Sequence, residues 1–267
     1  MRRWVKGFLG LSLLGAALFF GPPLPPDLQQ LRRTYNLRLL DRQGRLLREV
    51  ASSQATEQNW KSLEQVSPWL VQATLAAEDH RFYSHWGLDP LAVGRAMRSN
   101  WKAGQVLEGG STISQQVVRL LRPPADRGWR HKISETYWSL RLERGRSKQE
   151  ILECYLNLAP YGLQTYGIEA ASQLYFDKPA SQLSLAESSF LAVLPRAPET
   201  FAPYQNMDEI VVFQKKLLAQ MVRLQMITAE DERRALAEPL RLRPLDSTWE
   251  AGHFCDYLMT RLPPHTT

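Results

Sequence analysis

Most of this chain consists of short amphipathic segments with helical spacing, and each carries its own start and stop signals. Ser67-Pro68 and Asp89-Pro90 begin two of them, because a capping side chain followed by proline suits the first turn of a helix. Others begin with a capping pair at spacing i, i+3, as at Thr112/Gln115, Ser147/Glu150 and Ser184/Glu187. The pattern predicts a mainly α protein.

The predicted helices extend from Ser67 to Ala237 and leave little room for strands. They are expected at 67–78, 89–104 and 112–122, in a long segment ending at Gly145, at 147–156, at 184–195, and as a pair over 207–237 split near Ile227-Thr228. With 267 residues, of which 44% are hydrophobic, the chain can bury one good core.

One stretch near the N-terminus indicates β structure. Leu37–Leu40 and Leu46–Val50 flank a turn at 41–44, where Gly44 takes the position that favours a positive φ. Before this pattern, Pro22–Pro26 is typical of a stiff, extended spacer. We expect residues 22–59 to form a spacer and a β hairpin.

The first residues are typical of a membrane anchor. Arg2, Arg3 and Lys6 precede an apolar run from Phe8 to Phe20, which predicts a cytoplasmic N-terminus and an exported remainder. A cleaved signal peptide is the alternative, but the run ends in Gly21-Pro22-Pro23 and not in a small-x-small cleavage site. We therefore expect residues 1–21 to be a cytoplasmic tip and a retained transmembrane helix.

Composition leaves several partners open. The net charge of +6 fits an ordinary basic surface, a membrane surface, a phosphate-bearing substrate or nucleic acid. Cys154 and Cys255 are the only cysteines and form no CxxC pair, which argues against a structural zinc site. Cys154 lies in an apolar helical pattern, so we expect it to be a small buried residue.

Two carboxylates stand out by their surroundings. Glu78 opens the polar and aromatic run 78–89, and Glu135 lies inside the long predicted helix. Residue types alone favour charged helix surfaces in which such glutamates pair with nearby arginine and lysine. The cations that could instead bind an anion near them are Arg81, Arg119, Arg127, Arg130 and Lys132.

A glycine pair lies at the start of another predicted helix. Gly109-Gly110 is followed by the polar string Ser111-Thr112-Ile113-Ser114-Gln115-Gln116. Exposed backbone N–H groups at a helix start suit a phosphate or sugar hydroxyls. A plain turn and helix cap is the alternative.

Taken in order, these strings resemble the peptidoglycan glycosyltransferases (glycosyltransferase family 51). This is the transglycosylase module of class A penicillin-binding proteins and of monofunctional transglycosylases. The likeness runs from about Trp60 to Pro203 and rests on five motifs. These are Glu78-Asp79-x-x-Phe82-x-x-His85-x-Gly87-x-Asp89, Gly109-Gly110-Ser111-Thr112-Ile113-x-Gln115-Gln116, Lys132-x-x-Glu135 with Leu142-Glu143, Ile151–Asn157 with Tyr166–Ala171 and Tyr175-Phe176, and Leu183–Glu187 through Leu194–Pro198.

The resemblance implies a mainly α, lysozyme-like domain at 60–205 with a membrane-associated small lobe, a short β hairpin and an N-terminal transmembrane helix. It also implies that the enzyme polymerises lipid II into β-1,4 glycan with inversion and releases undecaprenyl pyrophosphate on the outer side of the bacterial cytoplasmic membrane. The partners would be lipid II, the growing lipid-linked glycan, the membrane and other cell-wall synthesis proteins, and no nucleic acid. Magnesium or manganese would accompany the pyrophosphate, with unknown protein ligands.

The resemblance also implies roles for residues. Glu78 would be the general base on the acceptor 4-hydroxyl, while Glu135, Lys132 and Arg81 would assist the donor's pyrophosphate. The implied catalytic pair is Glu78 and Glu135, and the implied substrate-binding residues are Asp79, Arg81, Phe82, His85, Gly110, Ser111, Thr112, Gln115, Gln116, Arg119, Arg127 and Lys132.

The sequence departs from the family pattern at a few positions. His131 stands where the family commonly has arginine, which makes one phosphate contact weaker or dependent on pH. Arg196 replaces a frequent glutamine, and Ala159-Pro160-Tyr161-Gly162 looks most like the penicillin-binding protein 1C type.

The remainder of the chain bears on a second activity. Ser99-x-x-Lys102 resembles a transpeptidase motif, but it lies inside a predicted helix without the companion motifs, so we expect no transpeptidase activity. Residues 206–267 are expected to form C-terminal helices and a linker toward an absent transpeptidase. The chain is then a fragment, a truncated product or a monofunctional enzyme.

Two other functions remain open at this stage. A lysozyme-like lytic enzyme would cleave glycan, but it needs a protonated acid and no phosphate-binding cations. An inactive scaffold for cell-wall synthesis would lack activity although the expected catalytic residues are present.

Overall fold

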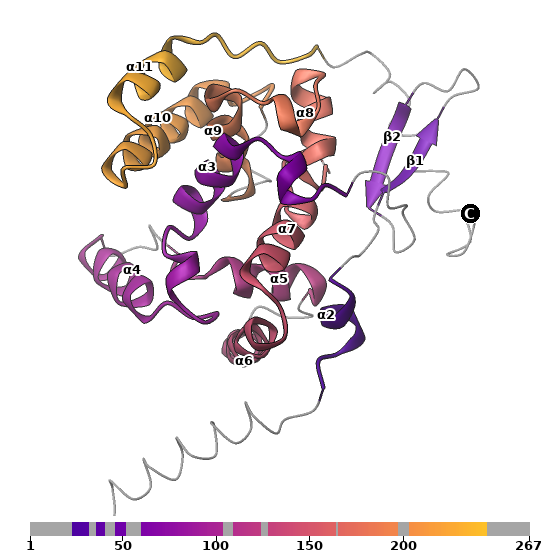
Figure 1. Ribbon diagram of the computed structural model, residues 1–267, viewed down its shortest axis with the longest axis vertical. Coiled ribbons are helices and arrows are strands. Elements are labelled where there is room, and N and C mark those ends of the chain that lie inside the picture. Colours follow the sequence, from indigo (N-terminus) through magenta and orange to yellow (C-terminus); the bar gives the residue numbers. More distant parts are fainter. Residues whose placement is uncertain are drawn as a thin grey trace, which may run out of the picture. The chain divides into compact units, whose positions relative to one another are not determined.

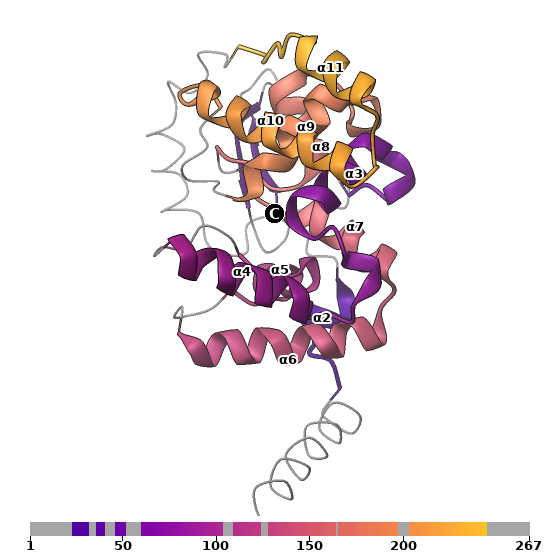
Figure 2. The same cartoon turned by 90° about the vertical axis from the view of Figure 1, so that its left-hand side faces the viewer.

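The computed structural model describes residues 23–31, 36–40, 46–51, 60–103, 109–123, 128–163, 165–196 and 203–244. The chain divides into two compact units, which Figures 1 and 2 show in two views. The first unit comprises 1–32 and 78–155, and the second comprises 33–77 and 156–267. The described residues are mainly helical, as the sequence predicted. The predicted boundaries at residues 21, 59 and 205 stay predictions.

The first unit is built around α5 and α6, which pack against each other. Its core contains fully buried apolar side chains from several elements, namely Phe82, Ile113, Val117, Leu121, Leu142, Ile151 and Leu152. Its described helical elements are α2 (Pro26–Gln30), the 3₁₀ turn η3 (Phe82–Ser84), α4 (Pro90–Ala103), α5 (Ile113–Leu121), α6 (Trp129–Gly145) and most of α7 (Lys148–Leu158).

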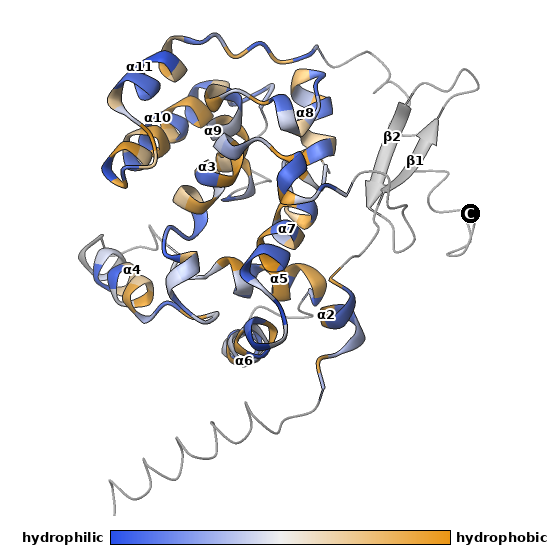
Figure 3. Cartoon of the chain, in the orientation of Figure 1, coloured by the Kyte–Doolittle hydropathy of each residue, from blue (hydrophilic) through white to orange (hydrophobic). Residues whose placement is uncertain are grey.

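The second unit has α9 at its centre. Every residue of α9 is buried, and α10 packs on it, with Ile210, Leu217 and Leu218 among the buried residues of α10. Figure 3 shows hydrophobic and hydrophilic residues together on α10, as expected for a helix with one buried face. The described elements are β1 (Asn36–Leu40), β2 (Leu46–Ala51), η2 (Leu63–Gln65), α3 (Pro68–Glu78), α8 (Ile168–Phe176), η4 (Ala180–Gln182), α9 (Leu185–Val193), η5 (Leu194–Arg196), α10 (Met207–Arg223) and α11 (Ala229–Ala237).

The helix starts follow the capping signals of the sequence. Thr112 and Gln115 form a reciprocal capping box at α5, and Ser184 forms another at α9 with Glu187. At α7, the Ser147 hydroxyl accepts from the Glu150 backbone N–H at 3.2 Å, and the Glu150 carboxylate accepts from the Ser147 backbone N–H at 2.8 Å. These predicted starts are confirmed. They could be predicted from the sequence because a cap depends on only four neighbouring residues.

Two helices were not predicted from the sequence. Gly167 occupies the N-cap position of α8 with φ +84°, so no side chain marks this start. A Cβ on Gly167 would lie 2.8 Å from the carbonyl oxygen of Asn157, so glycine is required by both its conformation and its surroundings. The other helix is α2, which begins at Pro26, where only an extended spacer was expected.

Other predictions from the N-terminal region have mixed outcomes. β1 pairs with β2 in antiparallel register, with Leu37 opposite Val50, while the predicted turn at 41–44 lies outside the described residues. Among the helices that are described, none is both long and apolar enough to cross a membrane. The predicted anchor at 1–21 lies outside them. Cys154 is a fully buried free thiol, as predicted.

Candidate active site

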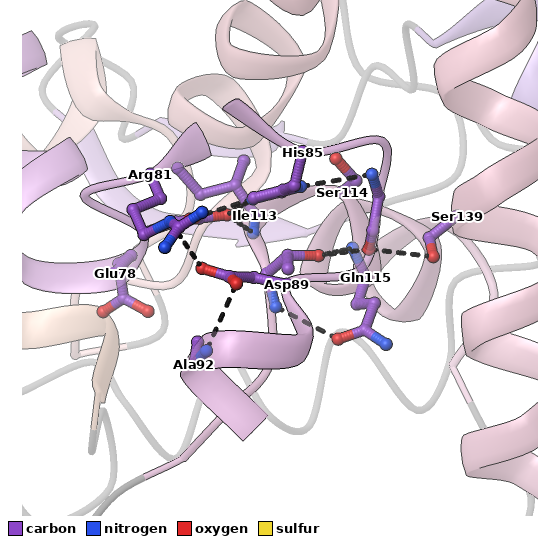
Figure 4. A network of polar contacts seen from close by, with 12 residues as sticks. Glu78, Arg81, His85, Asp89, Ala92, Ile113, Ser114, Gln115 and Ser139 are labelled. Carbon is purple, nitrogen blue, oxygen red and sulfur yellow. Dashed lines mark hydrogen bonds and ion pairs between the residues drawn. The ribbon is translucent and has the colours of Figure 1, made fainter. Parts of the chain in front are cut away.

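Asp79 and His85 form a buried pair immediately after α3. His85 Nε2 lies 3.0 and 2.9 Å from the two carboxylate oxygens of Asp79, and the Gly87 backbone N–H donates to His85 Nδ1 at 3.2 Å. Because Nδ1 accepts this bond, we assign the ring proton to Nε2, which donates to Asp79. The Asp79 carboxylate also accepts from the Ile113 backbone N–H at 3.1 Å (Figure 4). The pair therefore holds the beginning of α5.

Gly87 lets the polar loop after α3 approach α6 closely. Its φ is +87°, and a Cβ at this position would lie 2.8 Å from the Ser139 carbonyl oxygen. The Gly87 carbonyl accepts from the Thr112 hydroxyl at 2.7 Å and lies 3.2 Å from the Ser139 hydroxyl. A larger residue would push this loop away from both helices.

Glu78 is the last residue of α3 and is partly buried. Gln116 Nε2 donates to Glu78 Oε2 at 2.7 Å, and the Arg119 guanidinium donates to Gln116 Oε1 at 3.4 Å. The Gln116 amide is thereby oriented with its NH₂ group toward the carboxylate and its carbonyl toward the cation. The structure thus brings together the predicted residues Glu78, Gln116 and Arg119.

Lys132 and Glu135 form an ion pair on α6. The Glu135 side chain is only 2% exposed, whereas that of Lys132 is 49% exposed. The Lys132 ammonium also donates to the Ser111 hydroxyl at 2.8 Å. His131 Nε2 lies 3.8 Å from the other oxygen of Glu135. The predicted residues Ser111, Lys132 and Glu135 therefore form one cluster, with a cation on its exposed side.

The glycine–serine–threonine string is used largely for packing. A Cβ on Gly110 would lie 3.1 Å from the Val93 Cα, so the chain passes close to α4 at this point. Thr112 and Gln115 cap α5, and Gln115 Nε2 donates to the Thr136 hydroxyl on α6 at 2.9 Å. Thr112 and Gln115 are therefore used to cap α5, and Gln115 also joins α5 to α6.

Arg81 has a partner that the sequence did not indicate. Its Nε lies 3.4 Å from Asp89 Oδ2, while Asp89 Oδ1 accepts from the backbone N–H groups of Leu91 and Ala92 at 3.0 and 3.2 Å. Asp89 is 1% exposed and caps α4, as Figure 4 shows. Arg81 therefore contacts the α4 cap, and Arg127 lies outside the described residues.

Phe82 is completely buried and lies beside a polar network that the sequence did not predict. The Lys148 ammonium lies 4.2 Å from the centre of the Phe82 ring and 2.7 Å from Glu143 Oε1. The same carboxylate oxygen accepts from the Ser114 hydroxyl. Glu143 belonged to the third motif, but Ser114 lies on α5 and Lys148 on α7, so sequence spacing gave no signal for these two partners.

The resemblance implies a divalent metal beside the pyrophosphate, with unknown protein ligands. Among the residues that the structure describes, no group of three or more His, Cys, Asp or Glu side chains could hold a metal ion. Magnesium usually keeps several waters and often takes its other ligands from substrate phosphates. A divalent metal held beside the substrate's pyrophosphate stays a prediction.

Comparison with known proteins assigns the chain to a class. The family model described as transglycosylase matches residues 43–222, and the chain belongs to this family. It is 40% identical over 206 residues to penicillin-binding protein 2D of Bacillus subtilis (strain 168), which covers 76% of this chain and 30% of that protein. It is 31% identical over 264 residues to penicillin-binding protein 1A of Aquifex aeolicus (strain VF5), covering 96% of this chain and 36% of that protein.

A solved structure gives a weaker match. The crystal structure of penicillin-binding protein 1A from Haemophilus influenzae matches with a TM-score of 0.48 and 21% identity, over 86% of this chain and 25% of that chain. The chain spans 30% of the length of penicillin-binding protein 2D and 36% of the length of penicillin-binding protein 1A of Aquifex aeolicus.

Proposed function

We propose that this chain is a peptidoglycan glycosyltransferase that polymerises lipid II into β-1,4 glycan strands and releases undecaprenyl pyrophosphate. Membership of the transglycosylase family supports the reaction class. The observation that carries the proposal is the hydrogen bond from Gln116 to Glu78, because it orients the carboxylate that we propose as the base. The half-exposed ammonium of Lys132, held by Ser111 and Glu135, is available for an anionic leaving group.

Glu78 acts on the acceptor. Its carboxylate takes the proton from the 4-hydroxyl of lipid II while that oxygen attacks the anomeric carbon of the donor. The Gln116 amide donates to one carboxylate oxygen and restricts its rotation. The oxygen attacks the face of the anomeric carbon opposite the pyrophosphate, whose bond to that carbon breaks. The configuration at the anomeric carbon therefore inverts.

Lys132 acts on the donor, the growing lipid-linked glycan. Pyrophosphate leaves without prior protonation, and its departure is helped by cations fixed where negative charge develops. The Lys132 ammonium is half exposed and is positioned by Ser111 and Glu135. Arg119 supplies a second cation, held by Gln116.

Asp79, His85, Thr112 and Gln115 have a supporting role in this proposal. Within the first unit, hydrogen bonds from these side chains join the loop after α3 to the start of α5, and α5 to α6. These bonds keep Glu78 and Lys132 on fixed elements. We propose that these four residues position the site and do not bind the sugar.

The enzyme is proposed to work at the outer face of the cytoplasmic membrane, with residues 1–21 as its anchor. Large apolar side chains exposed on the first unit support a membrane-associated lobe in a lysozyme-like domain. They are Tyr83, Trp86, Leu91, Met97, Trp101, Trp129 and Ile133.

The test is incubation of the detergent-solubilised full chain with lipid II, followed by separation of the products by size. We expect glycan polymer that lysozyme digests. A parallel incubation with preformed glycan strands distinguishes the lytic alternative, because strand cleavage without polymer formation would refute the proposal. No change in either substrate would indicate a scaffold.

A further inference from the structure

Lys148 and Glu143 form a buried ion pair that the reaction proposed above does not use. The Lys148 ammonium lies 2.7 Å from Glu143 Oε1, and the two side chains are 17% and 5% exposed. Two apolar side chains of similar volume often stabilise a fold as well as a buried ion pair does, because both charges of the pair must leave water. Stability alone therefore does not account for this pair.

The ion pair contacts two segments of the first unit that belong to the proposed site. Glu143 Oε1 accepts from the hydroxyl of Ser114, which is completely buried in the first turn of α5. The Lys148 ammonium lies 4.2 Å from the centre of the Phe82 ring, in the loop after α3, and a cation over an aromatic ring is attracted to its π electrons. The pair thus links this loop to α5 through the end of α6 and the start of α7.

The same two segments carry the residues of the orienting hydrogen bond. Glu78 lies four positions before Phe82, and Gln116 lies two positions after Ser114 on α5. The bond from Gln116 Nε2 to Glu78 Oε2 is 2.7 Å long. A relative shift of about 1 Å between the segments would lengthen it beyond hydrogen-bonding range. The orientation of the proposed base therefore depends on how the loop and α5 are held together.

A second contact at the start of α5 restricts this helix further. The Asp79 carboxylate fixes the position of the Ile113 backbone N–H. The hydroxyl of the neighbouring Ser114 is directed to α6, where it meets the ion pair. Because the two contacts run to different elements, together they restrict both the position and the tilt of α5.

We infer that Glu143 and Lys148 are positioning residues for the proposed base. Their ion pair holds α5 and the loop after α3 at the spacing that lets Gln116 bond to Glu78. This inference rests on the proposed function and adds two residues that do not contact the substrate. Loss of the pair lowers kcat and leaves KM for lipid II nearly unchanged, because the Lys132 ammonium keeps its partners.

The first test replaces the whole pair by apolar side chains, in Glu143→Leu/Lys148→Met, using the solubilised full chain. Removal of one partner alone would leave a buried charge unpaired, whereas replacement of both is often neutral for stability. We expect kcat to fall about tenfold, the scale of one hydrogen bond, with KM for lipid II within about twofold of the wild type. An unchanged kcat would overturn the inference.

The same replacement in a Gln116→Ala background separates positioning from a general loss of folded enzyme. If the pair acts through Gln116, its replacement changes kcat by less than about twofold once the amide is absent, because the effects of coupled residues are not additive. A loss of about tenfold in both backgrounds would contradict the inference, since the effects of independent changes multiply.

Ser114→Ala removes the contact to α5 but leaves the ion pair intact, so it decides the question if the paired replacement does not fold. It is expected to lower kcat with little change in KM. A wild-type kcat in this variant would show that the pair does not act through α5.

The matched control is Lys178→Met/Glu187→Gln, which removes an ion pair of 2.7 Å from the second unit. The new glutamine keeps an oxygen that can accept from the Ser184 backbone N–H, so the cap of α9 is retained. This control is expected to leave kcat unchanged. A fall equal to that of the first replacement would overturn the inference, because loss of any ion pair would then slow the enzyme.

The second test does not depend on turnover. In the full chain with isotope-labelled glutamine, the NMR signal of the Gln116 side-chain amide is identified by its absence in Gln116→Ala. In Glu143→Leu/Lys148→Met, this signal is expected to move toward its position in Glu78→Ala, where the acceptor of its hydrogen bond is missing. An unchanged signal would overturn the inference. If the wild type forms no polymer, the proposed function fails, but this signal still decides whether the ion pair holds Gln116 on Glu78.

Discussion

At the scale of single residues, the site depends on one oriented amide. Gln116 donates to Glu78 and accepts from Arg119, so one side chain holds the proposed base and fixes a cation. A carboxylate in that position loses rotational freedom without losing its capacity to accept a proton. Substitutions at Glu78 and at Lys132 therefore separate the base from the cation.

Glu78→Gln is expected to abolish polymerisation while lipid II still binds. The new amide keeps an oxygen that can accept from Gln116, but it cannot take the proton of the acceptor hydroxyl. General-base catalysis is worth about a hundred- to ten-thousand-fold, so kcat is expected to fall on that scale. Polymer yield measures the rate, and lipid II binding is measured separately.

The control for this change is Gln116→Ala, which removes the orienting amide but leaves the base. It is expected to lower kcat by a smaller factor than Glu78→Gln. Polymerisation near the wild-type rate in Glu78→Gln would remove Glu78 from the mechanism.

Lys132→Ala is expected to weaken use of the lipid-linked donor. Hydrogen bonds to a charged group contribute about 1.5–3 kcal/mol, so kcat/KM is expected to fall about ten- to a hundredfold. Lys216→Ala, which removes an exposed positive charge from α10, is the matched control and is expected to leave kcat/KM unchanged. If both variants behave alike, Lys132 is merely a charge on the helix surface.

At the scale of elements, the start of α7 gives a prediction about pH. The hydrogen bond from the Ser147 backbone N–H lowers the pKa of Glu150, with further hydrogen bonds from the Ser147 hydroxyl and Arg146 acting in the same direction. A carboxylate whose pKa is lowered by folding stabilises the native state above its unfolded pKa. That stability is lost as the pH falls through its folded pKa.

Glu150→Gln is therefore expected to lower the free energy of unfolding at neutral pH by about 0.5 kcal/mol, a cap contribution reduced by solvent screening. The difference from the wild type is expected to shrink as the pH falls below the ordinary glutamate pKa of about 4.3, and to disappear once the pH lies below the lowered folded pKa. Urea denaturation at several pH values measures it. Glu209→Gln, an exposed change in the first turn of α10, is the control and is expected to show less pH dependence.

Several helix boundaries could be predicted from sequence, but side-chain partners could not. The starts of α5, α7 and α9 depend on residues three positions apart. The start of α8 was missed because Gly167 carries no capping side chain.

Long-range contacts explain the remaining misses in the site. The bond from Gln116 to Glu78 joins residues 38 positions apart, and Lys132 reaches 21 positions back to Ser111. The resemblance selected these four residues one by one, but their pairing depends on tertiary packing. The contact of Arg81 with Asp89 was also missed. The two residues are close in sequence, but their contact depends on the fold of the loop after α3, which sequence spacing does not indicate.

At the scale of the whole molecule, the expected anchor at residues 1–21 leads to a prediction about cleavage near the N-terminus. If residues 1–21 form a transmembrane helix, the protein isolated from bacterial membranes retains them. N-terminal sequencing of that protein is the measurement, and fractionation in high salt checks that it stays with the membrane. A mature protein that begins after Phe20 would favour a cleaved signal peptide.

Cys154 makes the first unit suitable for measurement with thiol reagents. Its thiol donates to the Leu31 carbonyl at 3.2 Å, and burial raises its pKa. Such reagents attack the thiolate, so the closed protein is nearly inert at this position. Modification of Cys154 requires either separation of the Leu31 segment from α7 or unfolding of the unit. The reaction rate of this one sulfur therefore reports how often the residues that follow the proposed anchor detach from α7 or the unit unfolds.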